Sequence, residues 1–288
     1  MNKEAPPVST PKLKRIGILL SNLQGVNVSA LKFLLVQLNV RATSFEYELL
    51  PCDSDDEFIK MLSSKSPVDR EKTRAGVVAF LDRYRTYLNQ QIKSYKLKEE
   101  SPDYFVLVTL VHFSDEYYSM RQGGLSILAL GNWERRMAPP SILEFVLTLV
   151  LRESVASISK SLRTSVHLGT KGCLFDFTLY LEEARFKVLQ GFVCDHCRKA
   201  LEQDSYPGLA DELTNVLSKD WLGKSTDAGS PAGIVSNLGF DLFLTKGLKP
   251  SAWESFLSTI QQEGVKELLK LIGGLILAGL IVWMGFKK

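Results

Sequence analysis

The chain has 288 residues, of which 45% are hydrophobic and 23% are charged, and its formal net charge at pH 7 is +3. This composition excludes a disordered chain and allows one sizeable hydrophobic core with a smaller appendage. The net charge is small and basic residues are interspersed with acidic ones, so nucleic-acid binding is not predicted. No apolar segment long enough for a secretory signal follows the polar start. We therefore expect the bulk of the protein to face the cytoplasm.

The first half of the chain alternates between strand and helix patterns. Short apolar or alternating runs that fit strands cover residues 16–20, 45–50, 104–111 and 125–130. Apolar positions spaced three and four apart predict helices over residues 29–38 and 69–97. The order strand, helix, strand predicts an α/β domain. The residues between the third and fourth strands are polar and contain glycine, which predicts a connection there.

A central core helix is predicted after two consecutive prolines. Ser141 and Glu144 have the spacing of a capping box, and the apolar residues that follow continue to about Leu162. Arg152 and Glu153 interrupt this otherwise apolar helix. Glu153 is either a catalytic relic that acted as a general base or half of a structural ion pair. The ion pair is favoured, because buried carboxylates are usually paired and a base needs a metal or nucleophile to activate.

Three of the four cysteines lie close together in the second half of the chain. Cys194 and Cys197 have the Cys-x-x-Cys spacing of a tetrahedral zinc site, and Cys173 offers a third thiolate. In a reducing compartment this grouping favours metal over a disulfide. His167 or His196 can supply the fourth ligand, and His167 is favoured because His196 lies inside the small loop between the paired cysteines. The sequence therefore predicts one structural zinc ion per chain.

The order of these motifs resembles the archaemetzincins, zinc-dependent proteases of the zincin class, over residues 103–201. In that family a helix with His-Glu-x-x-His is followed by Gly-x-x-His-Cys, Cys-x-Met and Cys-x-x-Cys. Here His167 stands six residues before Cys173, and the run from Cys173 to Phe175 resembles Cys-x-Met. Eighteen residues then separate Phe175 from Cys194. The resemblance implies a mixed α/β (α+β) zincin-like sheet with a central core helix.

The departures from the family pattern concern catalysis. Where His-Glu-x-x-His is expected, the helix reads Arg152-Glu-Ser-Val-Ala156, so Glu153 remains and both histidines are missing. The cysteine that follows the third histidine is replaced by Leu168. A catalytic zinc needs three protein ligands and an open position for water. The resemblance thus implies a degenerate metalloprotease that kept the structural zinc of His167 and the three cysteines and lost the catalytic one.

The C-terminal part of the chain has a different composition. After a helix predicted over residues 206–222, we expect the zincin-like cytosolic domain (1–222) to end, followed by a linker and short connector (223–250), a juxtamembrane amphipathic helix (251–267) and a transmembrane tail anchor (268–288). No residue from 271 to 286 is charged. A helix of this run with Leu268 and Leu269 spans roughly 28 Å, about one hydrocarbon core.

These observations leave three functional hypotheses open. The favoured one is a single-pass membrane protein whose inactive metalloprotease-like domain faces the cytoplasm and binds a protein or small-molecule ligand. A second is an active membrane-bound zinc peptidase with Glu153 as the base. A third is a membrane-perturbing effector, since Gly274 and Ala278 have the small-x-x-x-small spacing that lets membrane helices associate into a homo-oligomer.

Overall fold

A five-stranded mixed sheet organises the part of the chain that the computed structural model describes, residues 13–21, 23–164 and 167–240. The sheet order is β2-β1-β3-β5-β4, and β4 alone runs antiparallel to its neighbour. The strands are β1 (Lys14–Leu20), β2 (Phe45–Leu50), β3 (Tyr104–Thr109), β4 (Ser119–Gln122) and β5 (Leu125–Ala129). The predicted mixed α/β class is confirmed.

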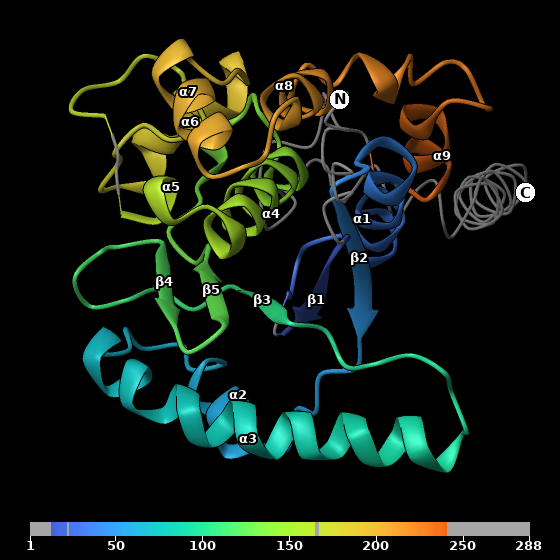
Figure 1. Cartoon of the computed structure of the whole chain (residues 1–288), viewed down its shortest axis with the longest axis vertical. Coiled ribbons are helices and arrows are strands. Elements are labelled where there is room, and N and C mark those ends of the chain that lie inside the picture. Colours follow the sequence, from blue (N-terminus) through green and yellow to red (C-terminus); the bar gives the residue numbers. More distant parts are fainter. Residues whose placement is uncertain (1–12, 22, 165–166, 241–288) are drawn as a thin grey trace, which may run out of the picture. The chain divides into compact units, whose positions relative to one another are not determined.

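Helices cover both faces of the sheet, which explains why every residue of the central strands β3 and β5 is buried. Side chains of β3 alternate between two hydrophobic cores: Val106 and Val108 point into one, and Phe105 and Leu107 into the other. The first core is closed by α1 (Val28–Arg41) and α4 (Ile142–Ile158), and the second by α2 (Glu57–Met61) and α3 (Arg70–Ser94). Figure 1 shows α3 running along one face of the sheet.

The predicted core helix is α4, and it begins as the sequence indicates. Ser141 accepts a hydrogen bond from the backbone of Glu144, and the Glu144 carboxylate accepts one from the backbone of Ser141. Nearly every residue of α4 is buried because the sheet lies on one side and further helices lie on the other. The helices after α4 are α5 (Lys160–Thr164), α6 (Leu181–Gln190), α7 (Asp195–Gln203), α8 (Leu209–Leu217) and α9 (Pro231–Asn237), with short 3-10 turns at Arg135–Met137 and Asp220–Leu222. Of these, α5 and α6 pack directly on α4.

The structure differs from the sequence prediction at the edge of the sheet. The polar stretch expected to be a connection contains β4, which pairs with β5 from Ser119 to Gln122. Only Met120 in this strand is buried. An edge strand with one buried side chain has too little hydrophobic alternation to be recognised from its sequence.

Residues 223–240, expected to be a linker, are instead folded onto the domain. Their helix α9 packs on α1, and the Asn27 side chain donates a hydrogen bond to the Leu238 carbonyl over 2.7 Å. The glycine-rich composition serves close packing here: a Cβ on Gly233 would lie 1.8 Å from the Asp227 carbonyl oxygen. The described residues up to 240 belong to one compact unit, which extends past the predicted boundary at residue 222.

The predicted juxtamembrane helix (251–267) and tail anchor (268–288) lie outside the described residues. Among the helices formed by described residues, none combines the length and apolar character needed to cross a bilayer.

Glu212 on α8 connects the C-terminal helices to the start of β2, and its removal should destabilise the fold. Its carboxylate accepts hydrogen bonds from the backbone N–H and hydroxyl groups of both Thr43 and Ser44, over 2.6 to 3.1 Å. We expect Glu212→Ala to lower the free energy of unfolding by about 1 to 2 kcal/mol in urea denaturation, because four donors lose a charged acceptor. Glu202→Ala, at an exposed carboxylate on α7, is the matched control and should change it by less than about 0.5 kcal/mol. Equal effects of the two variants would contradict this role.

Candidate metal centre

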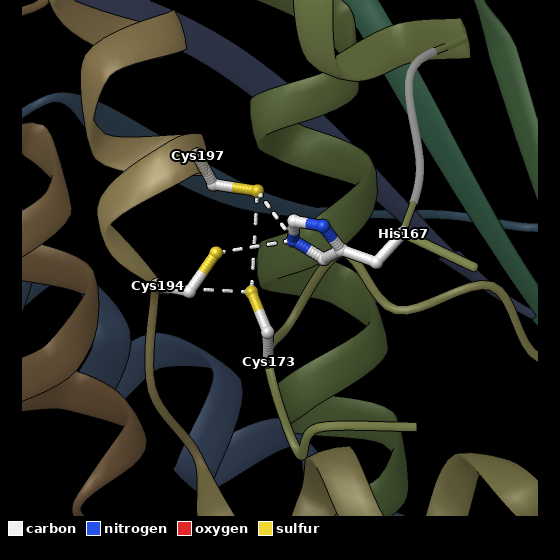
Figure 2. Close-up of side chains that lie close together, drawn as sticks. All are labelled: His167, Cys173, Cys194 and Cys197. Carbon is white, nitrogen blue, oxygen red and sulfur yellow. Dashed lines mark hydrogen bonds between the residues drawn. The ribbon is translucent and has the colours of Figure 1, made fainter. Parts of the chain in front are cut away.

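Four side chains predicted from the sequence meet at one point of the structure. The ligand atoms of His167, Cys173, Cys194 and Cys197 all lie within 4.8 Å of one another (Figure 2). The His167 Nε2 atom is 3.1 Å from the Sγ atoms of both Cys194 and Cys197, and the Sγ atoms of Cys173 and Cys197 are 4.0 Å apart. Around a tetrahedral zinc ion with ordinary bond lengths, such atoms lie about 3.5 to 3.8 Å apart. The arrangement therefore fits one zinc ion.

Local structure positions each ligand. Cys194 is the N-cap of α7 and Cys197 lies in its first turn, so both sulfurs are on the same side of the helix start. Cys173 is held by a bridge to Phe192, just before α7. The segment that carries His167 is bridged to Asp176 in the loop after Cys173. Two short segments and one helix start thus converge on the site.

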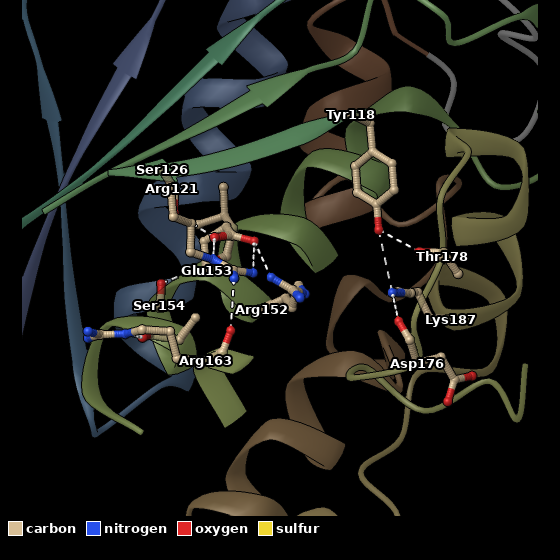
Figure 3. A network of polar contacts seen from close by, with 12 residues as sticks. Tyr118, Arg121, Ser126, Arg152, Glu153, Ser154, Arg163, Asp176, Thr178 and Lys187 are labelled. Atoms are coloured by element: carbon tan, nitrogen blue, oxygen red, sulfur yellow. Dashed lines mark hydrogen bonds and ion pairs between the residues drawn. The ribbon is translucent and has the colours of Figure 1, made fainter. Parts of the chain in front are cut away.

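Asp176 fixes the loop that presents Cys173. Its Oδ2 atom accepts hydrogen bonds from the backbone N–H groups of Lys171, Gly172 and Cys173, over 2.6, 2.6 and 3.1 Å. The buried ammonium group of Lys187 on α6 donates to the Asp176 carbonyl over 2.6 Å (Figure 3). Sequence analysis missed both residues, because nothing in the spacing of Asp176 and Lys187 marks them as support for a metal ligand.

The electrostatics of the cluster favour a bound cation. The hydrogen bond shared with Cys197 lowers the pKa of the Cys173 thiol to about 5, against the effect of burial, and the backbone N–H groups of Cys194 and Phe175 add to this. The same shared hydrogen bond, with burial, raises the pKa of Cys197. Three sulfurs that face one another cannot all carry a charge unless a cation lies between them. A zinc ion supplies that charge and would hold all three as thiolates.

The ligand set is that of a structural zinc site. Four protein ligands occupy every position of a tetrahedral ion, whereas a catalytic zinc keeps one position open for water. His196 is exposed and its ring lies edge-to-face on that of His167, with centroids 5.5 Å apart. His196 is therefore outside the group of four, as its place between the paired cysteines predicts.

Comparisons with known proteins give two solved structures. No protein-family model matches the chain, and no curated protein matches it. A zinc-dependent peptidase from Methanocorpusculum labreanum is 15% identical with a TM-score of 0.39, and the match covers 65% of this chain and 99% of that one. Archaemetzincin from Methanopyrus kandleri is 11% identical with a TM-score of 0.40, and the match covers 69% of this chain and 98% of that one. The assignment of zinc rests on the geometry of the four side chains.

Glu153, the predicted catalytic relic, lies in the middle of α4 and is not part of the metal cluster. Its buried carboxylate is bound on both oxygens (Figure 3). Arg121 on β4 donates through Nε and Nη2, Arg152 donates through Nη1 over 2.6 Å, and the Ser126 hydroxyl on β5 donates over 2.5 Å. This is the arrangement of a structural ion pair, and Arg121 was the partner that the sequence did not reveal.

Replacing one ligand should remove the zinc and lower thermal stability. We expect Cys194→Ser to lose most of the single zinc ion per chain, because serine is a poor ligand for zinc. Removal of the zinc should lower the free energy of unfolding by about 3 kcal/mol, which lowers the melting temperature by roughly 6 to 12 °C in a domain of this size. Metal analysis by mass spectrometry and thermal unfolding measure the two effects.

Cys52→Ser is the matched control, because Cys52 is a free cysteine outside the cluster. It should retain one zinc ion per chain. Absence of zinc from the wild type, or the same zinc content in both variants, would show that the four side chains do not form a zinc site.

Proposed function

We propose that residues 13–240 form a zinc-stabilised, metalloprotease-like domain that binds a ligand or partner without peptidase activity. The observation that carries this proposal is the complete set of four ligands, one histidine and three cysteines, around a single point. A zinc ion bound there has no open position at which to activate water. Its role is then to join the loop of residues 167–177 to the start of α7.

The surroundings of Glu153 also argue against hydrolysis. A general base must reach the proton of a water molecule or nucleophile with a free oxygen lone pair. Both oxygens of Glu153 already bind guanidinium or hydroxyl groups, and the side chain is fully buried. Within the described ranges, no second group of His, Cys, Asp and Glu side chains gathers closely enough to hold another metal ion.

Membrane attachment is the second part of the proposal. The apolar run from residue 268 to residue 286, in which Lys270 is the one charged residue, has the length of a membrane span and is followed by Lys287 and Lys288. We propose that it anchors the domain at the cytoplasmic side of a membrane. In the anchored protein, Gly274 and Ala278 would bring two such helices together.

The zinc-loaded protein should hydrolyse no peptide. With a mixed-sequence fluorogenic peptide library, we expect no cleavage above the buffer blank, and no change on Glu153→Gln. The same substitution should lower the free energy of unfolding by about 3 kcal/mol, because it leaves two guanidinium groups without a buried counter-charge. Glu134→Gln, in an exposed ion pair with Arg136, is the control and should be nearly neutral. Peptide cleavage that Glu153→Gln abolishes would establish the peptidase instead.

Deleting residues 268–288 should release the protein from membranes. We expect the full chain to float with phosphatidylcholine vesicles in a sucrose gradient, because an apolar run of this length is stable only in the bilayer. The deletion variant should remain at the bottom with one zinc ion per chain. Deletion of the polar residues 1–12 is the control and should leave flotation unchanged. Flotation of the variant that lacks residues 268–288 would contradict the anchor.

A further inference from the structure

A cavity of about 310 Å³ lies beside the edge strand β4, on the side of α4 that carries Arg152. We call it the arginine pocket, because its charged lining consists of five arginines and one carboxylate: Arg70, Arg74, Arg121, Arg152, Arg163 and Asp176. We propose that the arginine pocket binds the phosphate group of a small phosphorylated molecule. This proposal rests on the proposed function in one respect, namely that Glu153 holds arginines in place and is not a base.

The part of the pocket formed by Arg121, Arg152 and Arg163 carries more positive than negative charge. The single carboxylate of Glu153 forms ion pairs with two guanidinium groups, those of Arg121 and Arg152. Arg163 has no carboxylate partner within the described residues and donates to the carbonyls of Ala156 and Ser157, over 2.9 and 3.1 Å. At the rim, Arg70 and Arg74 pair with Asp115 and Glu71, which are partly exposed. Those rim pairs are screened by solvent and add little to binding.

Asp176 is the one carboxylate in the lining; the backbone engages its Oδ2 atom, and its Oδ1 atom is buried without a hydrogen-bond partner among the described residues. Its Oδ2 atom accepts hydrogen bonds from the backbone N–H groups of Lys171, Gly172 and Cys173, and these donors stabilise the charge of the carboxylate. The three guanidinium groups of Arg121, Arg152 and Arg163 outnumber the carboxylates of Glu153 and Asp176 by one, so this part of the pocket keeps one net positive charge. An anion is therefore the ligand that its charge favours.

The guanidinium of Arg152 is held ready to bind an oxyanion. The residue is only 9% exposed, and Glu153 fixes it through Nη1. Within the described part of the chain, its Nε atom is buried without a hydrogen-bond partner and its Nη2 makes no hydrogen bond. Arg163 is exposed; its Nε and Nη2 donate to backbone carbonyls, which leaves Nη1 free to bind a ligand. The buried Nε of Arg152 is a donor without an acceptor, which is costly, and its Nε and Nη2 form a fork that matches two oxygens of a phosphate group. The Nη1 atom of Arg163 can donate to a further oxygen.

The size and the rim of the cavity indicate a small molecule. Sites for small molecules range from about 300 to 1,000 Å³, so this cavity is at the lower end. Tyr117 and the partly exposed ring of Phe177 lie in its lining and offer apolar surface to the rest of the ligand. The wall that contains Phe177 and Thr178 is fixed by the hydrogen bond between the Thr178 and Tyr118 hydroxyls, over 2.6 Å (Figure 3). The protein itself therefore fixes the conformation of this wall, and no ligand is needed to form it.

Isothermal titration calorimetry of the zinc-loaded full chain tests this proposal, at constant ionic strength, with inorganic phosphate, glycerol 3-phosphate and glycerol as probes. We expect saturable binding of both phosphates and none of glycerol. Arg163→Gln should weaken binding about tenfold, because one charge-assisted hydrogen bond is lost. Arg152→Lys keeps the charge but not the fork and should weaken binding by a similar factor.

Arg136→Gln is the matched control, since it removes the same charge at an exposed site outside the pocket. It should leave the affinity unchanged, and the melting temperature of each variant shows that it is folded. No binding of phosphate by the wild type would overturn the proposal, as would equal weakening by Arg136→Gln or no effect of Arg163→Gln and Arg152→Lys. Zinc content and peptide cleavage are measured separately, so failure here is distinguishable from failure of the proposed function.

Discussion

The burial of one carboxylate, that of Glu153, is the constraint on which the centre of this domain depends. A charge in the middle of a core helix is tolerated only when partners surround it, because desolvation costs more than any single contact returns. Those partners come from α4 itself, from β5 and from the edge strand β4. Arg121 therefore joins the polar strand to the core helix although β4 contributes only one buried apolar side chain. The same contacts occupy both oxygens of the carboxylate, so one set of interactions joins the sheet edge to the core helix.

How far the sequence predicts this architecture depends on the range over which each interaction acts. Patterns within one element were sufficient: the apolar runs of β1, β3 and β5 and the capping box of Ser141 and Glu144 appear in the structure as expected. Interactions between distant elements could not be predicted from such patterns. Arg121 lies 32 residues from Glu153, and only the folded sheet brings them together. Glycine and serine after residue 222 indicated a linker, because the same residues that make chains flexible also permit the close contact at Gly233.

The metal centre was the most predictable part of the site, and the reason is chemical. Zinc requires particular side chains at short spacings, so Cys194 and Cys197 mark it even without a fold. The choice of His167 over His196 also followed from spacing, since a residue inside the Cys-x-x-Cys loop points away from the ligand sphere. What spacing cannot show is the support around the ligands. The side chains of Asp176 and Lys187 bind backbone N–H and carbonyl groups. Nearly every residue carries such groups, so the sequence does not reveal these partners.

One loop connects the two sites of the domain. Its Asp176 side chain organises the backbone that presents Cys173 to the metal, while Asp176, Phe177 and Thr178 form a wall of the arginine pocket. A zinc ion bound at the cysteines would restrict this loop, and a restricted wall would lower the entropic cost of binding the proposed ligand in the pocket. Coupling of this kind is reciprocal, so a ligand that orders the wall also favours retention of the metal. A zinc ion without an open coordination position can therefore still affect function, by keeping a binding surface in the conformation that its ligand requires.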